Sequence, residues 1–245
     1  STTLYSMLNE LDREKLNVVS LEDPVEYNIP MVNQSQVMPE IGYTFASGLR
    51  SILRQDPDII FVGEIRDKET AQLAIQAALT GHLVLSTLHT NSAAGVVPRL
   101  IDMGVDPYLI GPTLILAMAQ RLVRHTHPSA RKEVPMLPVV AEQYEKYFSD
   151  LPEQFKKDYP LPATIMDTVP SPESPTGMKG RIGVHEVFKI DRDMQALILK
   201  TPSDSDIYKL ARTKGFITMR EDGFLKSLKG EIPMTEVFNL ADDRD

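Results

Sequence analysis

The chain contains two short runs of consecutive apolar residues, at positions 59–62 and 83–85, each followed by polar residues. Runs of this length and composition are typical of strands that are buried on both faces of a parallel sheet. Between them, the apolar residues of segment 67–80 recur with the spacing of one helix face. A helix is therefore predicted there, with Asp67 as its N-cap and Gly81 just past its end. Strand, helix and strand in this order predict a right-handed parallel crossover.

The same pattern predicts further elements on both sides of this crossover. A helix is expected at the start of the chain and a short strand at 17–21, followed by a helix that Thr44 caps. From 92 to 124 the pattern is helical in two segments, the second of which includes residues 114–123. Gly104 and Pro107 separate these segments, and Pro112 is expected to restart or kink the second helix.

Proline is concentrated in one part of the sequence. Nine of the 18 prolines lie in segment 125–180, which predicts a loop-rich insertion rather than more of the sheet. Beyond the insertion, apolar positions with helical spacing between 194 and 211 predict short helices that pack as a C-terminal bundle.

Composition narrows the class of protein. With 245 residues, 42% of them hydrophobic and 24% charged, the chain can form a full globular core. A formal net charge of −8 argues against binding nucleic acid through a broad basic surface. The sequence has no apolar stretch of about 20 residues and no signal peptide, so a cytoplasmic location is expected. The absence of cysteine excludes disulfides and thiolate metal sites.

Polar residues suited to nucleotide chemistry follow the predicted strands. Glu64 follows the first apolar run and His89 the second, and ligands of parallel sheets bind beyond the carboxyl ends of the strands. Three carboxylates cluster in segment 22–27 after the strand at 17–21, which by composition is also typical of a solvated acidic loop. Arg50 and Arg54 lie four residues apart on one edge of the helix that follows Thr44.

Three segments carry a resemblance to a known family: 63–67, 80–84 and 86–91, with the sequences GEIRD, TGHLV and STLHTN. They resemble the Walker B and histidine-box region of the GspE/PilB family, the hexameric RecA-like ATPases of type II secretion and type IV pilus assembly. The resemblance extends, with one interruption, from residue 1 to about 237. It implies an α/β fold, a RecA-like P-loop NTPase core with a small irregular insertion and a helical C-terminal lobe.

The resemblance also implies roles for individual residues. Glu64 becomes the acid that polarises the attacking water. Segment 22–27 is similar to the family's aspartate box, which makes Glu22 the second catalytic acid, ranked above Asp23 and Glu26. The remaining residues that match the family's nucleotide site are expected to offset phosphate charge, to bind the nucleotide or to sense its state: Ser1, Thr2, Asp23, Arg50, Arg54, Gly63, Arg66, His82 and His89.

The start of the chain matches the end of the family's phosphate-binding motif. Ser1 corresponds to the residue that ligates magnesium, with Thr2 beside it, and the glycine-rich loop and its lysine are expected upstream in a parent protein. Such a loop cradles the phosphates with backbone N–H groups, and its lysine neutralises their charge. ATP and Mg²⁺ are therefore the expected ligands.

By this comparison the chain is expected to divide into a core at 1–124, an insertion at 125–180 and a helical lobe at 181–245. Family members often have four zinc-binding cysteines in the insertion. This sequence has none, and His125 and His127 alone do not complete a structural zinc site, so no zinc is expected.

The predicted function is ATP hydrolysis that powers pilus assembly or protein secretion. A homohexamer is expected, with an inner-membrane platform protein as partner and only peripheral membrane association; no nucleic acid is expected. Two alternatives stay open. RecA-like hexamers also move DNA, and the isolated chain could be a non-catalytic assembly module.

The expected position of the phosphate-binding loop gives a first prediction. The 245-residue chain alone should bind MgATP poorly, because only strand-end residues remain to hold the phosphates. Titration calorimetry should detect little heat of binding. Micromolar affinity in this same chain would show that the loop is not essential to the site.

Overall fold

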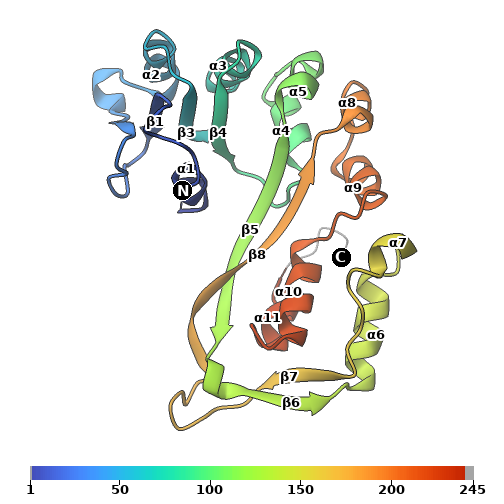
Figure 1. Cartoon of the computed structure of the whole chain (residues 1–245). Helices are drawn as coiled ribbons and strands as arrows, with labels where there is room; N and C mark the ends of the chain where they lie inside the picture. The colour runs from blue at the N-terminus through green and yellow to red at the C-terminus, as the bar shows by residue number, and fades with distance from the viewer. Residues whose placement is uncertain (1, 241–245) are drawn as a thin grey trace. The chain divides into compact units, whose positions relative to one another are not determined.

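The computed structural model describes residues 2–240, and the chain forms two compact units, each assembled from segments distant in sequence (Figure 1). Unit 1 comprises the described residues up to 90 together with 96–115 and 191–202. Unit 2 comprises 91–95, 116–190 and the described residues from 203 onward.

Unit 1 is an α/β unit built on a parallel sheet with the strand order β2-β1-β3-β4. Its aromatic core includes Tyr5 and Phe61, both fully buried. Its elements are α1 (Thr2–Asn9), β1 (Val18–Glu22), β2 (Asn33–Gln36), a 3-10 turn η1 (Pro39–Ile41), α2 (Phe45–Ile52), β3 (Ile59–Ile65), α3 (Lys68–Leu79), β4 (Leu83–Leu88), α4 (Val96–Asp102), α5 (Pro107–Thr113) and α8 (Arg192–Ile198).

The predicted crossover is confirmed as β3, α3 and β4. The Asp67 side chain caps α3 by accepting a hydrogen bond from the Thr70 backbone N–H, and Gly81 has a φ of 102° just past the helix. Thr44 caps α2 through a capping box with Ser47. Both strands are longer than predicted, so Glu64 lies inside β3 rather than after it.

Unit 2 is organised around β5 (Leu116–Thr126) and β8 (Met178–Lys189), which form a long antiparallel pair (Figure 1). A second antiparallel pair is formed by β6 (Arg131–Pro135) and β7 (Thr164–Thr168). The helices of this unit are the 3-10 turn η2 (Pro128–Ala130), α6 (Pro138–Tyr147), α7 (Glu153–Lys156), α9 (Asp204–Arg212), α10 (Met219–Leu228) and α11 (Met234–Phe238).

The predicted helix at 114–123 is wrong, because these residues belong mostly to strand β5. The segment is rich in leucine, alanine and methionine, which favour helix in isolation. Its pairing with β8, about sixty residues downstream, overrides that preference, as strand formation depends on cross-strand neighbours. Pro112 does not restart a helix either, since it lies inside α5, which ends at Thr113.

The compact units do not follow the expected boundaries at 124 and 180. The chain enters the proline-rich segment through β5 and leaves it through β8, and because these strands pair with each other, the segment forms one unit with both. The segment is also more regular than expected, since it contains the ten-residue helix α6 and the β6–β7 pair. The expected C-terminal lobe is divided, with α8 in unit 1 and α9 to α11 in unit 2.

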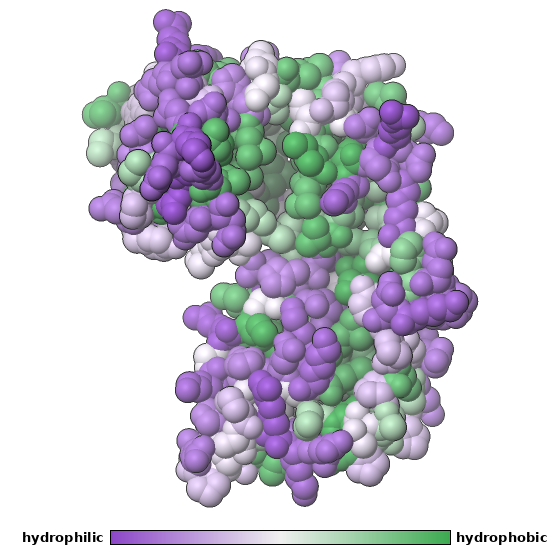
Figure 2. Space-filling view, in the orientation of Figure 1, coloured by the Kyte–Doolittle hydropathy of each residue, from purple (hydrophilic) through white to green (hydrophobic). Residues whose placement is uncertain are grey.

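Hydrophilic residues cover part of the surface of unit 1 (Figure 2). On the face seen in Figure 2, the surface around α1 and α2 is mostly hydrophilic. Among the residues that the structure describes, no helix is both long enough and apolar enough to cross a membrane.

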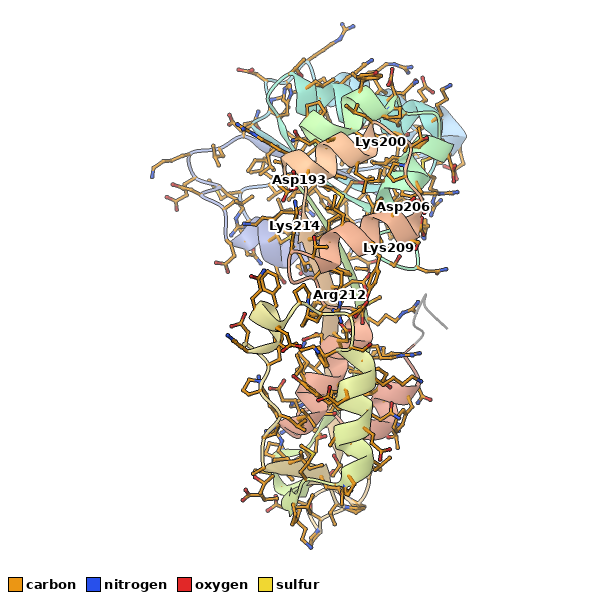
Figure 3. All side chains as sticks on the ribbon, turned by 90° about the vertical axis from the view of Figure 1, so that its right-hand side faces the viewer. Asp193, Lys200, Asp206, Lys209, Arg212 and Lys214 are labelled. Carbon is orange, nitrogen blue, oxygen red and sulfur yellow. The ribbon has the colours of Figure 1, made fainter. Side chains whose placement is uncertain are left out.

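A buried ion pair stabilises unit 2. Arg212, at the end of α9 (Figure 3), is 3% exposed and donates from Nη1 and Nη2 to the carboxylate of Glu221, at 2.7 and 2.9 Å. The guanidinium also donates to the Asp150 carboxylate and to the backbone carbonyl oxygens of Tyr147 and Phe216. Because Glu221 is fully buried, its charge depends on this partner.

Arg212→Ala should therefore lower the free energy of unfolding by about 3–5 kcal/mol, since it leaves a buried carboxylate without its cation. Urea unfolding measures the change. Lys15→Ala is the matched control, because Lys15 and Asp12 form an exposed pair, and such pairs contribute little. Equal stability of the two variants would contradict this assignment.

Candidate active site

The carboxyl ends of three strands meet at one edge of the unit 1 sheet. β1, β3 and β4 are parallel neighbours, and the register pairs Leu21 of β1 with Val62 of β3. Glu22, Glu64 and His89, which lie far apart in sequence, therefore come to the same edge. This edge is where ligands bind in parallel α/β sheets.

Gly63 allows β1 and β3 to approach each other closely at this edge. The register of β3 with β4 shifts between Val62 and Ile65, so the strand is irregular here. A Cβ atom at Gly63 would lie 3.2 Å from the carbonyl oxygen of Leu21 and 3.3 Å from Cα of Glu22. Both are backbone atoms of β1, so a larger residue would push the strands apart.

Glu64 is mostly buried, with 12% of its side chain exposed, and it has two basic partners. Arg66 Nη2 lies 2.5 Å from Oε1, and His89 Nε2 lies 2.9 Å from Oε2. Burial raises the pKa of Glu64, but the hydrogen bonds from His89 and Arg66 outweigh burial and hold the pKa below its ordinary value. The carboxylate is therefore ionised at neutral pH, as an acceptor of a water proton must be.

Glu22 is 2% exposed and is fixed by hydrogen bonds from neutral donors. Tyr5 Oη donates to Oε2, while Ser20 Oγ and Gln34 Nε2 donate to Oε1 at 2.5 and 3.0 Å. Burial and the hydrogen bond to Glu22 raise the pKa of Tyr5 to about 12. Tyr5 thus stays protonated and connects helix α1 to the end of β1.

The two acids line one small polar cavity of about 140 Å³. Its lining residues are Glu22, Asp23, Pro24, Phe45, Gly63, Glu64 and Thr87. Carboxylate and hydroxyl oxygens are the ligands that Mg²⁺ prefers, and the ion usually keeps several waters and binds phosphate as well. This donor set therefore fits a magnesium ion bound together with a nucleotide.

The predicted arginines do not gather around this cavity. Arg66 contacts Glu64, but Arg50 pairs with Glu69 of α3 on the surface. Arg54 is exposed in the turn after α2, which ends at Ile52, so Arg50 and Arg54 do not share one helix edge as expected.

His82 lies at the opposite end of β4 from His89. Its Nδ1 lies 2.8 Å from the carbonyl oxygen of Ala77 and 3.1 Å from Thr80 Oγ1, so it contacts the C-terminal turn of α3. The six residues of β4 separate the two histidines, and at about 3.3 Å per residue this distance is too long for both to contact one phosphate group.

Two further residues of the expected nucleotide site, Thr2 and Asp23, are exposed. Thr2 is the exposed first residue of α1, and Asp23 is exposed at the rim of the cavity. Ser1, the expected magnesium ligand, lies outside the described residues.

Sequence reasoning missed several residues of the site. Thr87 Oγ1 donates to the Gly63 carbonyl oxygen at 2.7 Å and so links β4 to the irregular part of β3. Thr87 could have been predicted as a site residue, because it lies in the STLHTN motif at 86–91. Phe45 in the cavity wall and Tyr5 beneath Glu22 carry no comparable signal, because an aromatic residue in a helix usually indicates only core packing.

This sheet, with acids at its carboxyl edge, is the fold of a RecA-like P-loop ATPase. The chain is similar to the crystal structure of the pilus retraction motor PilT with bound ADP, at 26% identity and a TM-score of 0.69, over 99% of this chain and 57% of that one. The ATPase DotB of Legionella pneumophila shares the fold, with 23% identity and a TM-score of 0.61, over 96% of this chain and 55% of that one.

Sequence relatives identify the family. The model of the family described as type II/IV secretion system protein matches residues 1–239, and the chain belongs to this family. It is 44% identical to type II secretion system protein E of Pectobacterium carotovorum subsp. carotovorum, over 98% of this chain and 46% of that protein. It is 42% identical to type II secretion system ATPase E of Vibrio cholerae serotype O1, with the same coverage. The chain thus spans about half the length of these relatives.

The two partners of Glu64 give a prediction about its titration. His89→Ala or Arg66→Ala should each raise the pKa of Glu64. Burial raises this pKa, and each substitution removes one of the two hydrogen bonds that lower it. Carbon NMR of the Glu64 carboxyl as a function of pH measures the change. Arg50→Ala is the control, since Arg50 pairs with Glu69, and it should leave the titration of Glu64 unchanged.

The same contacts predict the direction of the pH dependence of stability. A carboxyl with a depressed pKa stabilises the fold above its unfolded-state pKa, and this contribution is lost as pH falls through the folded-state value. The stability difference between wild type and His89→Ala should therefore shrink on acidification below the ordinary carboxyl range. A difference that grows in acid would contradict the assigned contacts.

Proposed function

We propose that this chain is the hydrolytic part of an ATPase motor that powers type II secretion or type IV pilus assembly. The observation that carries the proposal is Glu64, a mostly buried carboxylate with two basic partners in a polar cavity at the carboxyl edge of the sheet. The proposal is supported by family membership and by relatives that are named secretion ATPases.

Glu64 accepts a proton from the attacking water or orients that water toward the γ-phosphate. Its low pKa keeps the carboxylate available at neutral pH, and its two hydrogen bonds limit its orientation. His89 is placed to respond to the nucleotide, because it already contacts the carboxylate that faces the reaction. A change in phosphate content at the cavity would alter this contact, which makes His89 the proposed sensor of nucleotide state.

Glu22 and Asp23, which line the cavity with Glu64, would hold the magnesium ion. By the family resemblance, Ser1 and Thr2 would hold it as well. When bound, Mg²⁺ neutralises the charge that develops on the phosphate oxygens. Glu22 is held on its two oxygens by Tyr5, Ser20 and Gln34, so we assign it the role of a fixed charge rather than a mobile base. Gly63 lines the same cavity.

Arg66 acts with His89 to lower the pKa of Glu64, and Arg50 and Arg54 are proposed to offset phosphate charge. Arg50 is exposed and paired with an exposed Glu69, and such a pair contributes little stability, so the arginine can be released to a phosphate at small cost. His82 contacts α3 at the other end of β4, and we assign it no part in this cavity.

The motor is proposed to act as a homohexamer on the cytoplasmic side of the inner membrane, bound to a platform protein of the secretion or pilus machine. A net charge of −8 is unfavourable for the second candidate, a nucleic-acid translocase. ATPase activity that DNA stimulates would favour the translocase. A full natural protein that neither binds nor hydrolyses ATP would favour a non-catalytic assembly module.

The catalytic assignment predicts the effect of Glu64→Gln in the full natural protein. The substitution keeps the volume of the side chain but removes the charge, so turnover should fall by about 10²–10⁴-fold while ATP affinity stays unchanged. Steady-state ATPase assays and equilibrium nucleotide binding on one preparation measure both quantities.

The control for Glu64→Gln is the melting temperature of the same preparation. If Glu64 only stabilises the fold, the substitution should lower stability by about 1 kcal/mol, as loss of a capping hydrogen bond does, and leave turnover per folded molecule nearly intact. That outcome would transfer the catalytic role to Glu22, and Glu22→Gln would then be measured in the same way.

A further inference from the structure

His89 contacts Glu64, and the chain leaves unit 1 after the next residue, Thr90. β4, His89 and Thr90 belong to unit 1, segment 91–95 belongs to unit 2, and the chain returns to unit 1 at α4. The segment has no helix or strand, yet Ala93 within it is fully buried. Buried backbone N–H groups need hydrogen-bond partners, so something in unit 2 must satisfy those of this segment.

Glu186 of strand β8 provides such a partner. Its Oε1 accepts a hydrogen bond of 2.6 Å from the backbone N–H of Ala93, and the side chain is 5% exposed. A hydrogen bond to an ionised carboxylate is about twice as strong as one between neutral groups. The segment after His89 is therefore held to β8, more than ninety residues away in sequence, by a buried charged contact.

The second carboxylate oxygen of Glu186 accepts a hydrogen bond from a helix. Oε2 accepts a hydrogen bond of 3.2 Å from the backbone N–H of Met219, the first residue of α10. The first N–H groups of a helix have no partner inside the helix, and a carboxylate at this end is favoured by the helix dipole. One carboxylate thus joins segment 91–95, β8 and α10.

His89 depends on its backbone for its position. Its side chain is 74% exposed, so little packing holds it against Glu64, and its backbone is continuous with β4 before it and with segment 91–95 after it. Ala93, which Glu186 holds, is only four residues beyond His89.

We propose that Glu186 is a positioning residue for ATP hydrolysis, which acts by fixing segment 91–95 and thereby holding His89 on Glu64. This inference rests on the proposed function, since it assigns to Glu186 the support of that same site.

The test is a double-mutant cycle in the full natural protein. Glu186→Gln removes the charge and turns an N–H donor toward one of the two backbone N–H groups. We expect kcat to fall by about 10- to 100-fold, because a small displacement of a positioned group costs rates of that order, while ATP affinity is unchanged. In a His89→Ala background, Glu186→Gln should have little further effect on kcat, since its target is already missing.

Glu236→Gln is the matched control. Glu236 is also a buried carboxylate of unit 2 that accepts a backbone N–H bond, here from Arg124 at 3.0 Å. It also pairs with the Arg124 guanidinium at 2.8 Å, and its hydrogen bonds are to Arg124 rather than to segment 91–95. Its substitution should lower the melting temperature and leave kcat per folded molecule unchanged. Glu186→Asp, which keeps the charge but shortens the reach, is measured in the same cycle and replaces Glu186→Gln if that variant does not fold.

The outcomes separate this inference from the function on which it rests. Equal fold-losses of kcat from the Glu186 substitution with and without His89 would overturn the positioning role and leave the ATPase assignment standing. An equal loss of kcat in Glu236→Gln would also overturn it, because destabilisation of unit 2 would then be the cause. A wild-type protein without ATPase activity would overturn the proposed function itself.

Discussion

The close approach of β1 and β3 at Gly63 is the constraint on which the site depends. A Cβ atom at position 63 would lie 3.2 Å from the Leu21 carbonyl oxygen and 3.3 Å from Cα of Glu22, so any larger residue would require the two strands to shift. This approach places Glu22 and Glu64 in the walls of one cavity. Thr87 fixes the arrangement from the third strand through its hydrogen bond to the Gly63 carbonyl oxygen.

Buried carboxylates connect distant parts of this chain. Glu22 is satisfied by hydroxyl and amide donors, Glu186 and Glu236 accept backbone N–H groups, and Glu221 pairs with Arg212. A buried charge is costly unless each oxygen has a partner, so each of these acids specifies which segments must meet. Glu64 differs from them in that the side chains of its two partners, Arg66 and His89, are mostly exposed.

The proline-rich segment is stabilised by packing. Tyr144 and Phe148 of unit 2 stack with ring centroids 4.8 Å apart, and Phe148 and Phe224, both fully buried, lie in the same core. Aromatic side chains bury large areas and gain further from their mutual geometry. This cluster, together with the β6–β7 pair, gives a physical basis for a folded insertion in a sequence without cysteine.

The sequence by itself determined those helices and strands that are specified by residues within a few positions of one another. The crossover from β3 through α3 to β4 was predictable because apolar spacing, the Asp67 cap and the glycine after the helix act within a few residues. The position of Glu64 and His89 at the sheet edge followed from strand order. By contrast, only the tertiary structure decided that 116–126 is a strand, since its partner β8 lies far along the chain and local composition favours a helix. The hydrogen bonds of Glu22 with Tyr5 and Gln34 and that of Ala93 with Glu186 depend in the same way on distant segments. Hydrogen bonds between such segments produce no periodic pattern in the sequence from which they could be predicted.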